Sequence, residues 1–304
     1  MKINVKVPAT TANLGPGFDA LGLALNLWNE AEFSAADDGR MDVSISGEGM
    51  GTLPEDESNC IVESALQIYE MAGVQCKGLH VDCINRIPIG SGLGSSSAAM
   101  LTGMLGANAL LGEPFRQDQI LKLAIEEEGH PDNVAPAMLG GLVASIVFED
   151  RVVYLKLPAR ANHGPIHMTV VWPEFDFPTI EARRILPEQV NRRDAVHNIS
   201  RAVLVTEALR TGDMDLLGKS MADVLHQPYR IPLIPGAKQA MDAARTEGAD
   251  AVAFSGAGPS LIAFSSRKQT NIGEAMSREF NKAGLVSKIY HLQVSYEGAE
   301  VTII

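Results

Sequence analysis

The composition of this 304-residue chain, with 46% hydrophobic and 20% charged residues, is typical of a globular protein with one large domain or two ordinary ones. Its formal net charge of −12 excludes the usual kind of nucleic-acid-binding protein, because such proteins neutralise phosphates with a basic surface. A nucleotide is compatible with this charge, since backbone amides and a helix N-terminus hold phosphate without basic residues.

Membrane and disulfide-rich classes are excluded by other features. The longest apolar run, 138–148, is much shorter than the roughly 20 residues that span a bilayer, and the first residues alternate like a strand rather than a signal peptide. The three cysteines, Cys60, Cys76 and Cys83, lack C-x-x-C spacing and are expected to be reduced thiols. We therefore expect a cytoplasmic protein with no membrane partner.

The first half of the chain alternates strand and helix signals. Strands show period-2 alternation, and helices show apolar residues at positions i, i+3 and i+4. These patterns predict strands over 3–7 and 41–46, a helix over 59–73, a strand over 79–87, helices over 95–111 and 116–129, and a hairpin over 140–157 that turns near Glu149 and Asp150.

The second half begins after 158–165, a stretch that has few apolar residues and carries proline and glycine. We place a domain boundary there, which divides the chain into domains over 1–160 and 161–304. The order of elements beyond it, with several helices in the first crossover, is the β-α-β-β-α-β order of ferredoxin-like domains, so an α+β fold is expected. The patterns predict a strand over 167–172, helices over 191–210, 213–226 and 236–248, strands over 251–254 and 261–264, a helix near 270–283 and a strand over 287–294.

A glycine-serine loop with the sequence PIGSGLGSSSAAM, residues 88–100, stands between a predicted strand and a predicted helix. It departs from three phosphate-loop and nucleophile motifs. The dinucleotide fingerprint needs glycine where Ser95 stands, and the hydrolase elbow needs glycine in place of Ala98. The P-loop needs a lysine, and none occurs between Lys77 and Lys122.

The physical properties of this loop favour an anion. Glycine permits positive φ and close backbone approach to a ligand, and residues 95–97 open an alanine-rich helix whose free N–H groups and dipole attract negative charge. The serine hydroxyls can donate to phosphate or ligate Mg²⁺, which prefers oxygen ligands. The alternative interpretation is an ordinary serine cap after a glycine turn.

Three further segments favour a ligand site over a plain cap. Residues 8–25 (PATTANLGPGFDALGLAL) contain a polar, glycine-rich loop, and 255–260 (SGAGPS) is a glycine-rich turn between two predicted strands. Residues 126–137 (EEEGHPDNVAPA) add acidic and polar side chains. Each alone is a weak signal, because glycine turns are common, but together they make a specific constellation.

With these segments the sequence resembles the GHMP kinase superfamily over essentially its full length and, within it, the homoserine kinase family. The resemblance implies a two-domain GHMP kinase fold, with a ribosomal-protein-S5-domain-2-like N-terminal domain and a ferredoxin-like C-terminal domain. It also implies ATP-dependent phosphorylation of the side-chain hydroxyl of L-homoserine, which gives O-phospho-L-homoserine on the way to threonine. The segments that carry it are 8–25, 88–98 and 255–260 for the superfamily motifs, and 129–137, 178–187 and 226–236 for homoserine kinases.

The resemblance implies a site for ATP and Mg²⁺. We expect the metal near the Ser96 hydroxyl and the Glu128 carboxylate, with Glu126 as the alternative, because residues 126–128 step about 100° apart on a helix and cannot all face one ion. For Glu126 and Glu127, the other interpretation is a solvent-exposed acidic helix end without a ligand. Asn59 resembles the adenine-contacting asparagine of the superfamily. The residues expected around the ATP phosphates are Pro88, Ile89, Gly90, Ser91, Gly92, Leu93, Gly94, Ser95, Ser96 and Ser97.

The same resemblance implies how the amino acid is held. Homoserine is a zwitterion, so the carboxylate of Asp19 suits its ammonium group, and the guanidinium groups of Arg183 and Arg230 suit its carboxylate. Arg184 and Arg193 are nearby alternatives. The substrate-binding residues implied are Asn13, Asp19, His130, Asn133, Arg183 and Arg230.

Phosphoryl transfer is expected to proceed without a protein general base. Several superfamily relatives carry an aspartate at the position of Asn133, and an amide cannot accept a proton at neutral pH. Asn133 would then orient the hydroxyl while the γ-phosphate takes the proton, although Asp132 stays open as a base. Thr179 is expected to support the transferring phosphoryl group. Because Pro131 disfavours helix at His130, we expect the side chains of residues 130–133 to lie on a loop.

Two other functions stay open at this point. One is a nucleotide-binding regulatory protein that kept the scaffold and lost catalysis, and the other is a serine hydrolase acting through Ser95 or Ser96. Members of the family are often dimeric, so the resemblance allows a homodimer that binds L-homoserine and no nucleic acid.

Overall fold

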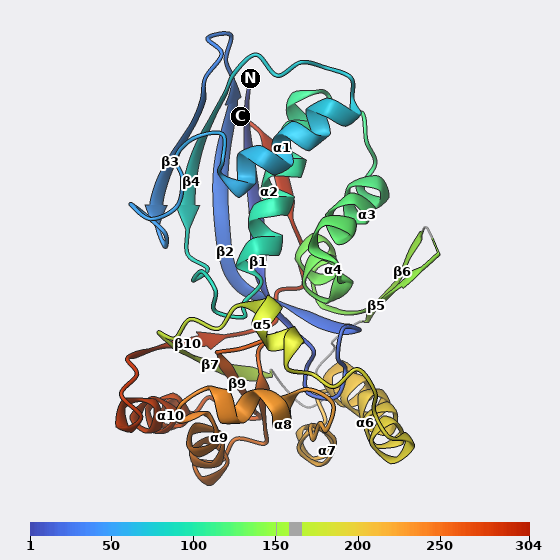
Figure 1. Cartoon of the computed structure of the whole chain (residues 1–304), viewed down its shortest axis with the longest axis vertical. Coiled ribbons are helices and arrows are strands. Elements are labelled where there is room, and N and C mark those ends of the chain that lie inside the picture. The colour runs from blue at the N-terminus through green and yellow to red at the C-terminus, as the bar shows by residue number, and fades with distance from the viewer. Residues whose placement is uncertain (150, 158–165) are drawn as a thin grey trace.

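Two sheets, one above the other in Figure 1, organise the protein. The structure is a computed structural model that describes residues 1–149, 151–157 and 166–304. The predicted turn residue Asp150 and the predicted boundary at 158–165 lie outside the described residues. A seven-stranded sheet and a four-stranded sheet, both packed against helices, confirm the α+β fold class.

The upper sheet has the strand order β11-β1-β2-β4-β3, and β5 pairs with both β2 and β6. Its described strand pairs are antiparallel except β3 with β4. The sequence patterns do not identify β2. Its first five residues are all buried, and the alternation of buried and partly buried residues begins only at Asn29. The strands are β1 (Lys2–Ala12), β2 (Leu21–Ala35), β3 (Met41–Gly47), β4 (Leu79–Asn85), β5 (Leu142–Phe148), β6 (Arg151–Leu157) and β11 (Glu300–Ile303).

Four helices cover one face of this sheet, and α2 lies at their centre (Figure 1). Most of α2 is buried, which explains why its sequence is apolar all round rather than amphipathic. Gly103 of α2 lets α1 approach, since a Cβ there would lie 2.0 Å from the Ile61 carbonyl oxygen. The helices are α1 (Cys60–Met71), α2 (Ser95–Leu110), α3 (Gln117–Glu128) and α4 (Pro131–Leu139).

The loop expected at residues 130–133 is wrong, because α4 begins there. His130 has extended φ and ψ of −154° and 146° and precedes the helix, and Pro131 occupies its first turn, where a missing N–H breaks no helix bond. Proline restricts the residue before it, but not the residues after it. Asp132 and Asn133 therefore project from a helix in directions that the helix fixes.

The lower sheet has the order β10-β7-β9-β8 with antiparallel neighbours, which is the strand order of a ferredoxin-like domain and confirms that prediction. Helices α9 and α10 pack against this sheet (Figure 1). The elements are β7 (His167–Pro173), β8 (Ala251–Phe254), β9 (Leu261–Ser265), β10 (Ser287–Leu292), α9 (Ala237–Thr246) and α10 (Thr270–Lys282).

The crossover from β7 to β8 contains several helices, as predicted, but the helix expected over 213–226 ends at Ser220. Beyond it, the Asp223 carboxylate accepts the backbone N–H groups of residues 225–227 and so replaces helix bonds with side-chain bonds. The described crossover comprises α5 (Thr179–Arg184), α6 (Arg192–Thr211), α7 (Met214–Ser220), α8 (Gln227–Arg230) and a 3-10 turn over Ile231–Leu233.

After β10 of the lower sheet, the chain returns to the upper sheet, where the C-terminal strand β11 pairs with β1 and Val301 lies opposite Val5. Val294 also bridges to Leu25 of β2. The last residues of the chain therefore tie the upper sheet to the lower one. In the described parts of the chain, every helix is too short or too polar to cross a membrane.

Candidate active site

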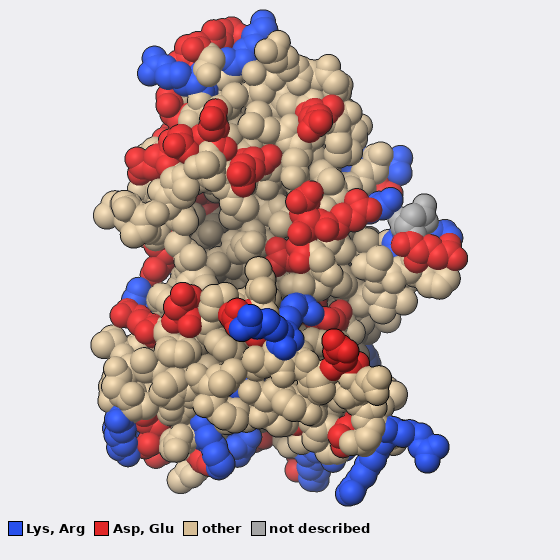
Figure 2. Space-filling view, viewed as in Figure 1, with Lys and Arg blue, Asp and Glu red and all other residues tan. Residues whose placement is uncertain are grey.

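A cavity of about 470 Å³ opens between the upper and lower halves. Figure 2 shows it as a hollow with acidic side chains above it and basic side chains over α5 below it. Its lining comes from segments far apart in the sequence: the glycine-serine loop, the start of α1, the junction of α3 and α4, α5, and the turn at 256–258. The predicted motifs therefore converge on one space.

The glycine-serine loop shapes one wall of this cavity through three left-handed glycines. Gly90, Gly92 and Gly94 have φ of 64°, 78° and 70°, a conformation that other residues adopt at a cost. The first hydrogen bond of α2 runs from the Ala98 N–H to the Gly94 carbonyl oxygen. The N–H groups of residues 95–97 precede that bond and are free of helix bonds, which is the arrangement that binds anions.

Only part of the loop faces the cavity. The lining residues are Ile89, Gly90, Gly92, Gly94, Ser95 and Ser96, whereas Pro88, Ser91, Leu93 and Ser97 are buried behind them. The Ser91 hydroxyl donates to the Pro88 carbonyl at 2.7 Å and closes the turn. Ser97 lies two residues after Ser95 on α2, so its side chain points toward the core, where its hydroxyl has no partner among the described residues. Its placement does not support the expected donation of this hydroxyl to phosphate.

The turn at 255–258 supports the loop from the lower half. The Ser255 hydroxyl lies 2.7 Å from the Gly92 carbonyl oxygen, and the Ser260 N–H donates to the Ser91 carbonyl at 3.3 Å. A Cβ on Gly92 would lie 2.2 Å from the Ser255 carbonyl oxygen. The glycine-rich turn at 255–258 therefore holds the glycine-serine loop in place.

The two side chains expected around the metal meet in the structure. Ser96 Oγ lies 3.5 Å from Glu128 Oε2, and both residues line the cavity. Glu126 is exposed and pairs with Lys122 at 3.6 Å, so the geometry favours Glu128. Within the described ranges, no cluster of three or more His, Cys, Asp or Glu side chains could hold a metal. A cation beside Ser96 and Glu128 would need further oxygen ligands, such as phosphates.

Asn59 and Thr179 both line the cavity. The Asn59 side chain is already engaged, since its Oδ1 accepts the Ile61 N–H at 2.9 Å and its Nδ2 donates to the Pro54 carbonyl at 2.7 Å. It therefore fixes the start of α1 as an N-cap, and an adenine could use only its remaining amide hydrogen and the second lone pair of its Oδ1. Thr179 is the first residue of α5 and is exposed.

Arg230 is buried at the cavity, and no carboxylate of the described residues forms an ion pair with it. It is 1% exposed, and its Nε and Nη1 donate to the carbonyls of Ala182 and Gly256 at 3.2 and 3.4 Å. Burial, reinforced by the nearby charge of Arg183, lowers the pKa of Arg230 to about 10. Ion pairs within the described residues do not include this guanidinium. A buried cation of this kind is compensated by an anionic ligand.

Arg183 and Asp19 bind one another. Two hydrogen bonds of 3.0 and 2.7 Å join their side chains, and they raise the pKa of Arg183. Asn13 holds the loop that presents Asp19: its Oδ1 accepts the Asp19 N–H at 3.0 Å and its Nδ2 donates to the Gly256 carbonyl at 2.9 Å. The alternatives Arg184 and Arg193 are exposed, and Arg184 pairs with Glu181.

His130, Asp132 and Asn133 lie together at the cavity. Burial alone would lower the pKa of His130, but a 2.6 Å hydrogen bond and the charge of Asp132 outweigh it, so this pKa is raised. The Asp132 side chain is only 2% exposed and is engaged by His130, which disfavours it as a base. Asn133 Oδ1 accepts the Thr10 hydroxyl at 2.8 Å, which leaves its Nδ2 group for a ligand.

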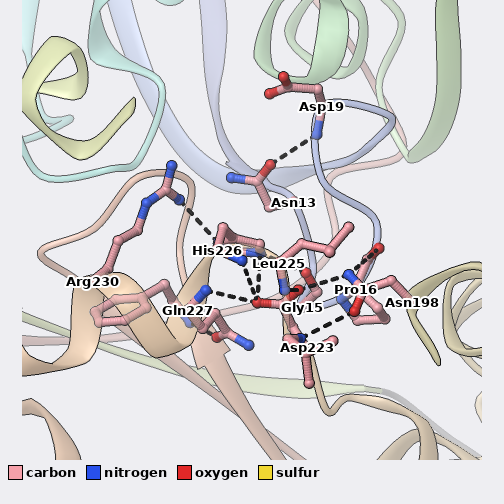
Figure 3. Close-up of polar contacts among 12 residues, drawn as sticks. Asn13, Gly15, Pro16, Asp19, Asn198, Asp223, Leu225, His226, Gln227 and Arg230 are labelled. Carbon is pink, nitrogen blue, oxygen red and sulfur yellow. Dashed lines mark hydrogen bonds and ion pairs between the residues drawn. The ribbon is translucent and has the colours of Figure 1, made fainter. Parts of the chain in front are cut away.

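Four buried residues around Arg230 are missed by the sequence analysis (Figure 3). They are Asn198, Asp223, His226 and Gln227. The imidazole of His226 contacts Arg230 and the Gly15 carbonyl oxygen, and Asp223 binds the backbone around it. The segment 226–236 was part of the family resemblance, so His226 could have been noticed, but nothing in the sequence signals the contact of Asn198 with Asp223.

Comparison with protein families adds an independent finding. The family model described as GHMP kinases N terminal domain matches residues 59–141, and the model described as GHMP kinases C terminal matches residues 205–282. The two matches lie on either side of the predicted boundary at 158–165. Mevalonate kinase structures share the fold, with a TM-score of 0.70 at 14% identity for one of them over 96% of this chain and 99% of that chain.

Closer relatives share both fold and sequence. The chain is 44% identical to homoserine kinase of Moorella thermoacetica over 98% of this chain and 99% of that protein. It is 39% identical to homoserine kinase of Carboxydothermus hydrogenoformans over 97% of this chain and 95% of that protein. The crystal structure of homoserine kinase from Cytophaga hutchinsonii is similar with a TM-score of 0.87 at 35% identity, covering 99% of this chain and 97% of that chain.

Proposed function

The chain belongs to the homoserine kinase family of the GHMP kinases, and from this premise we propose that it transfers the γ-phosphoryl group of ATP to the side-chain hydroxyl of L-homoserine. The product would be O-phospho-L-homoserine, an intermediate on the way to threonine. With its free thiols, the protein fits a cytoplasmic enzyme. The observation that carries the proposal is the buried Arg230, a cation without an ion-pair partner among the described residues, which lines the same cavity as the glycine-serine loop, here called the phosphate loop.

The phosphate loop and the first turn of α2 bind the ATP phosphates through backbone N–H groups and the Ser95 and Ser96 hydroxyls. Mg²⁺, when bound with ATP, would neutralise charge on the β- and γ-phosphates, and Ser96 and Glu128 are the residues that would hold it. Their facing oxygens at 3.5 Å fit a hard cation. This explains why the loop needs no lysine.

Homoserine is oriented by its two charges. Its carboxylate compensates the Arg230 guanidinium, with Arg183 close by, and its ammonium group is attracted by Asp19. Asn13 contributes by holding the loop that presents Asp19. His130 lines the same cavity, and its raised pKa favours the charged form, in which Nε2 can donate to the substrate. The substrate hydroxyl then points toward the phosphate loop.

Transfer forms a bond between the homoserine side-chain oxygen and the γ-phosphorus and breaks the bond from that phosphorus to the β–γ bridging oxygen. Asn133 Nδ2 orients the attacking hydroxyl, whose proton passes to a γ-phosphate oxygen. Thr179, exposed in the lining, supports the transferred group. Catalysis therefore rests on positioning and charge compensation rather than on a protein base.

A coupled ADP-release assay with L-homoserine, L-serine, L-threonine and mevalonate tests the proposal. We expect Mg-ATP-dependent turnover with homoserine far above the other three alcohols. Turnover of mevalonate or serine instead would reject homoserine as the substrate. ATP binding without turnover of any alcohol would indicate a regulatory protein, and labelling of Ser95 or Ser96 by a fluorophosphonate would indicate a hydrolase.

A further inference from the structure

His226 lies fully buried between two parts of the proposed substrate site (Figure 3). Its Nε2 is 2.7 Å from the Gly15 carbonyl oxygen, and its Nδ1 is 3.0 Å from Nη1 of Arg230. Its ring also stacks on Phe18, with centroids 5.1 Å apart. One side chain thus connects the loop that presents Asp19 with the buried guanidinium.

The partners of His226 fix its protonation state. A carbonyl oxygen only accepts and a guanidinium only donates, so Nε2 carries the proton and Nδ1 presents a lone pair. An imidazolium would direct a second N–H at Arg230. Burial favours the neutral form and lowers the pKa of His226; Arg230 acts in the same direction, while Asp223, the Gly15 carbonyl and Asp19 oppose it.

A rigid frame holds this imidazole. The Asp223 carboxylate accepts the N–H groups of Leu225, His226 and Gln227 at 2.9, 3.1 and 2.7 Å. It also accepts the Asn198 amide at 2.7 Å, and Asn198 contacts the Pro16 carbonyl oxygen at 3.3 Å. The frame is therefore tied to the same loop that His226 reaches, and it fixes the backbone that carries the imidazole.

Arg230 depends on this contact for its direction. Apart from His226, its hydrogen-bond partners among the described residues are the carbonyls of Ala182 and Gly256, and the bond to Gly256 is long at 3.4 Å. Gly256 also accepts a hydrogen bond from Asn13, so Arg230 is connected to the loop at 13–19 through Gly256 as well as through His226. Loss of the Nδ1 lone pair would leave the guanidinium held by one good hydrogen bond.

We propose that His226, in its Nε2-protonated neutral form, is a positioning residue that fixes Arg230 relative to the loop at 13–19 and thereby sets recognition of the substrate's carboxylate. The inference deepens the proposed function and rests on it. The proposal predicts that His226 favours an α-amino acid over an amino alcohol. The two kinds of ligand differ by the carboxylate, which Arg230 binds.

The test compares two ligands in three proteins: wild type, His226→Gln and His226→Asn. Asn offers an acceptor near the Nδ1 position, and Gln offers a donor near the Nε2 position only. We expect His226→Gln to raise KM for L-homoserine at least tenfold while KM for ATP stays within twofold. The rise in KM for L-homoserine should be smaller in His226→Asn than in His226→Gln. The inhibition constant of 3-aminopropan-1-ol, which lacks the carboxylate, should stay within twofold in both variants.

A matched control is His80→Gln, which replaces a half-exposed histidine on β4 that pairs with Asp42, away from the cavity. It should leave every constant unchanged. Parallel weakening of homoserine and 3-aminopropan-1-ol in the His226 variants, or an equal rise in KM for ATP, would show a merely structural role and overturn the proposal. Wild-type protein that does not phosphorylate homoserine would instead refute the proposed function.

A measurement on unaltered protein decides the matter if the variants fail to fold. With ¹⁵N-labelled histidine, the ring nitrogen shifts of His226 at pH 7 should report the Nε2–H neutral tautomer, and homoserine binding should perturb them more than 3-aminopropan-1-ol does. The Nδ1–H tautomer, an imidazolium, or equal responses to both ligands would contradict the proposal.

Discussion

Gly92 is the point where the phosphate loop and the turn at 255–258 come closest, and Gly92→Ala tests that contact. The added Cβ would lie 2.2 Å from the Ser255 carbonyl oxygen and 2.8 Å from that of Gly258, whereas ordinary contacts begin at 3.4 Å. Both obstacles are backbone atoms, which cannot rotate away as a flexible side chain can. The methyl group therefore fits only if the two loops separate.

Gly90 provides the matched control within the same loop. Its φ of 64° is close to the 78° of Gly92, but a Cβ there would meet no atom within 4 Å. Gly90→Ala should therefore cost only the left-handed backbone penalty of about 1–2 kcal/mol. Gly92→Ala adds overpacking, which typically costs ~1–3 kcal/mol. We expect Gly92→Ala to lower the free energy of unfolding by the larger amount, with a difference of roughly 1–3 kcal/mol.

Urea unfolding followed by circular dichroism measures both costs, and steady-state kinetics adds the functional consequence. Separation of the two loops would displace the N–H groups that open α2, so KM for ATP should rise at least tenfold in Gly92→Ala, by more than in Gly90→Ala. Equal loss of stability in the two variants would show that the backbone conformation alone matters. It would refute the claim that the turn at 255–258 supports the phosphate loop.

Three further predictions follow from the site. Glu128→Gln should raise the Mg²⁺ concentration needed for half-maximal turnover at least tenfold, whereas Glu126→Gln, a change on the exposed side of α3, should leave it unchanged; equal effects would reject Glu128 as a ligand. Arg230→Met should raise KM for homoserine at least a hundredfold. The folded pKa of Arg230, about 10, lies well below the usual range of a guanidinium, so the folded chain releases this proton first. The unfolding free energy of wild type should therefore rise relative to Arg230→Met as pH increases through 10 in urea titrations. Asp132→Asn should retain turnover and lower the pKa of His130 in NMR titrations; loss of turnover with unchanged ATP binding would restore Asp132 as a base.

Local periodicity predicted most of the elements that have a single buried face. The ferredoxin-like order of the lower sheet followed from short strands bounded by glycine and polar turns, and the structure confirms it. The strand β2 was missed because its first residues are buried on both sides. The pairing of β11 with β1 joins the two ends of the chain, and such a long-range contact leaves no local pattern in the sequence.

The phosphate loop was the most predictable part of the site, because its function depends on local backbone conformation. Alternate glycines followed by a helix start are visible in the sequence, and the structure shows positive φ at Gly90, Gly92 and Gly94. The direction of each side chain was less accessible. Ser96 faces Glu128, but Ser97 is turned into the core by the rotation of α2, whose buried face the loop motif does not specify.

At the proposed homoserine site, the sequence predicted which types of residue are present but not which of them contact one another. Asp19 and Arg183 were expected to bind opposite charges of one ligand, and in the structure they bind each other across 164 positions of sequence. A zwitterion can replace this ion pair without leaving either charge unpaired, whereas a ligand with one charge leaves the other member of the pair uncompensated. Arg230 differs because no carboxylate in the described part of the chain forms an ion pair with it. Under the proposed function, the carboxylate of homoserine would therefore gain most by binding at Arg230, and the Asp19–Arg183 pair would then determine whether an ammonium group is accepted beside it.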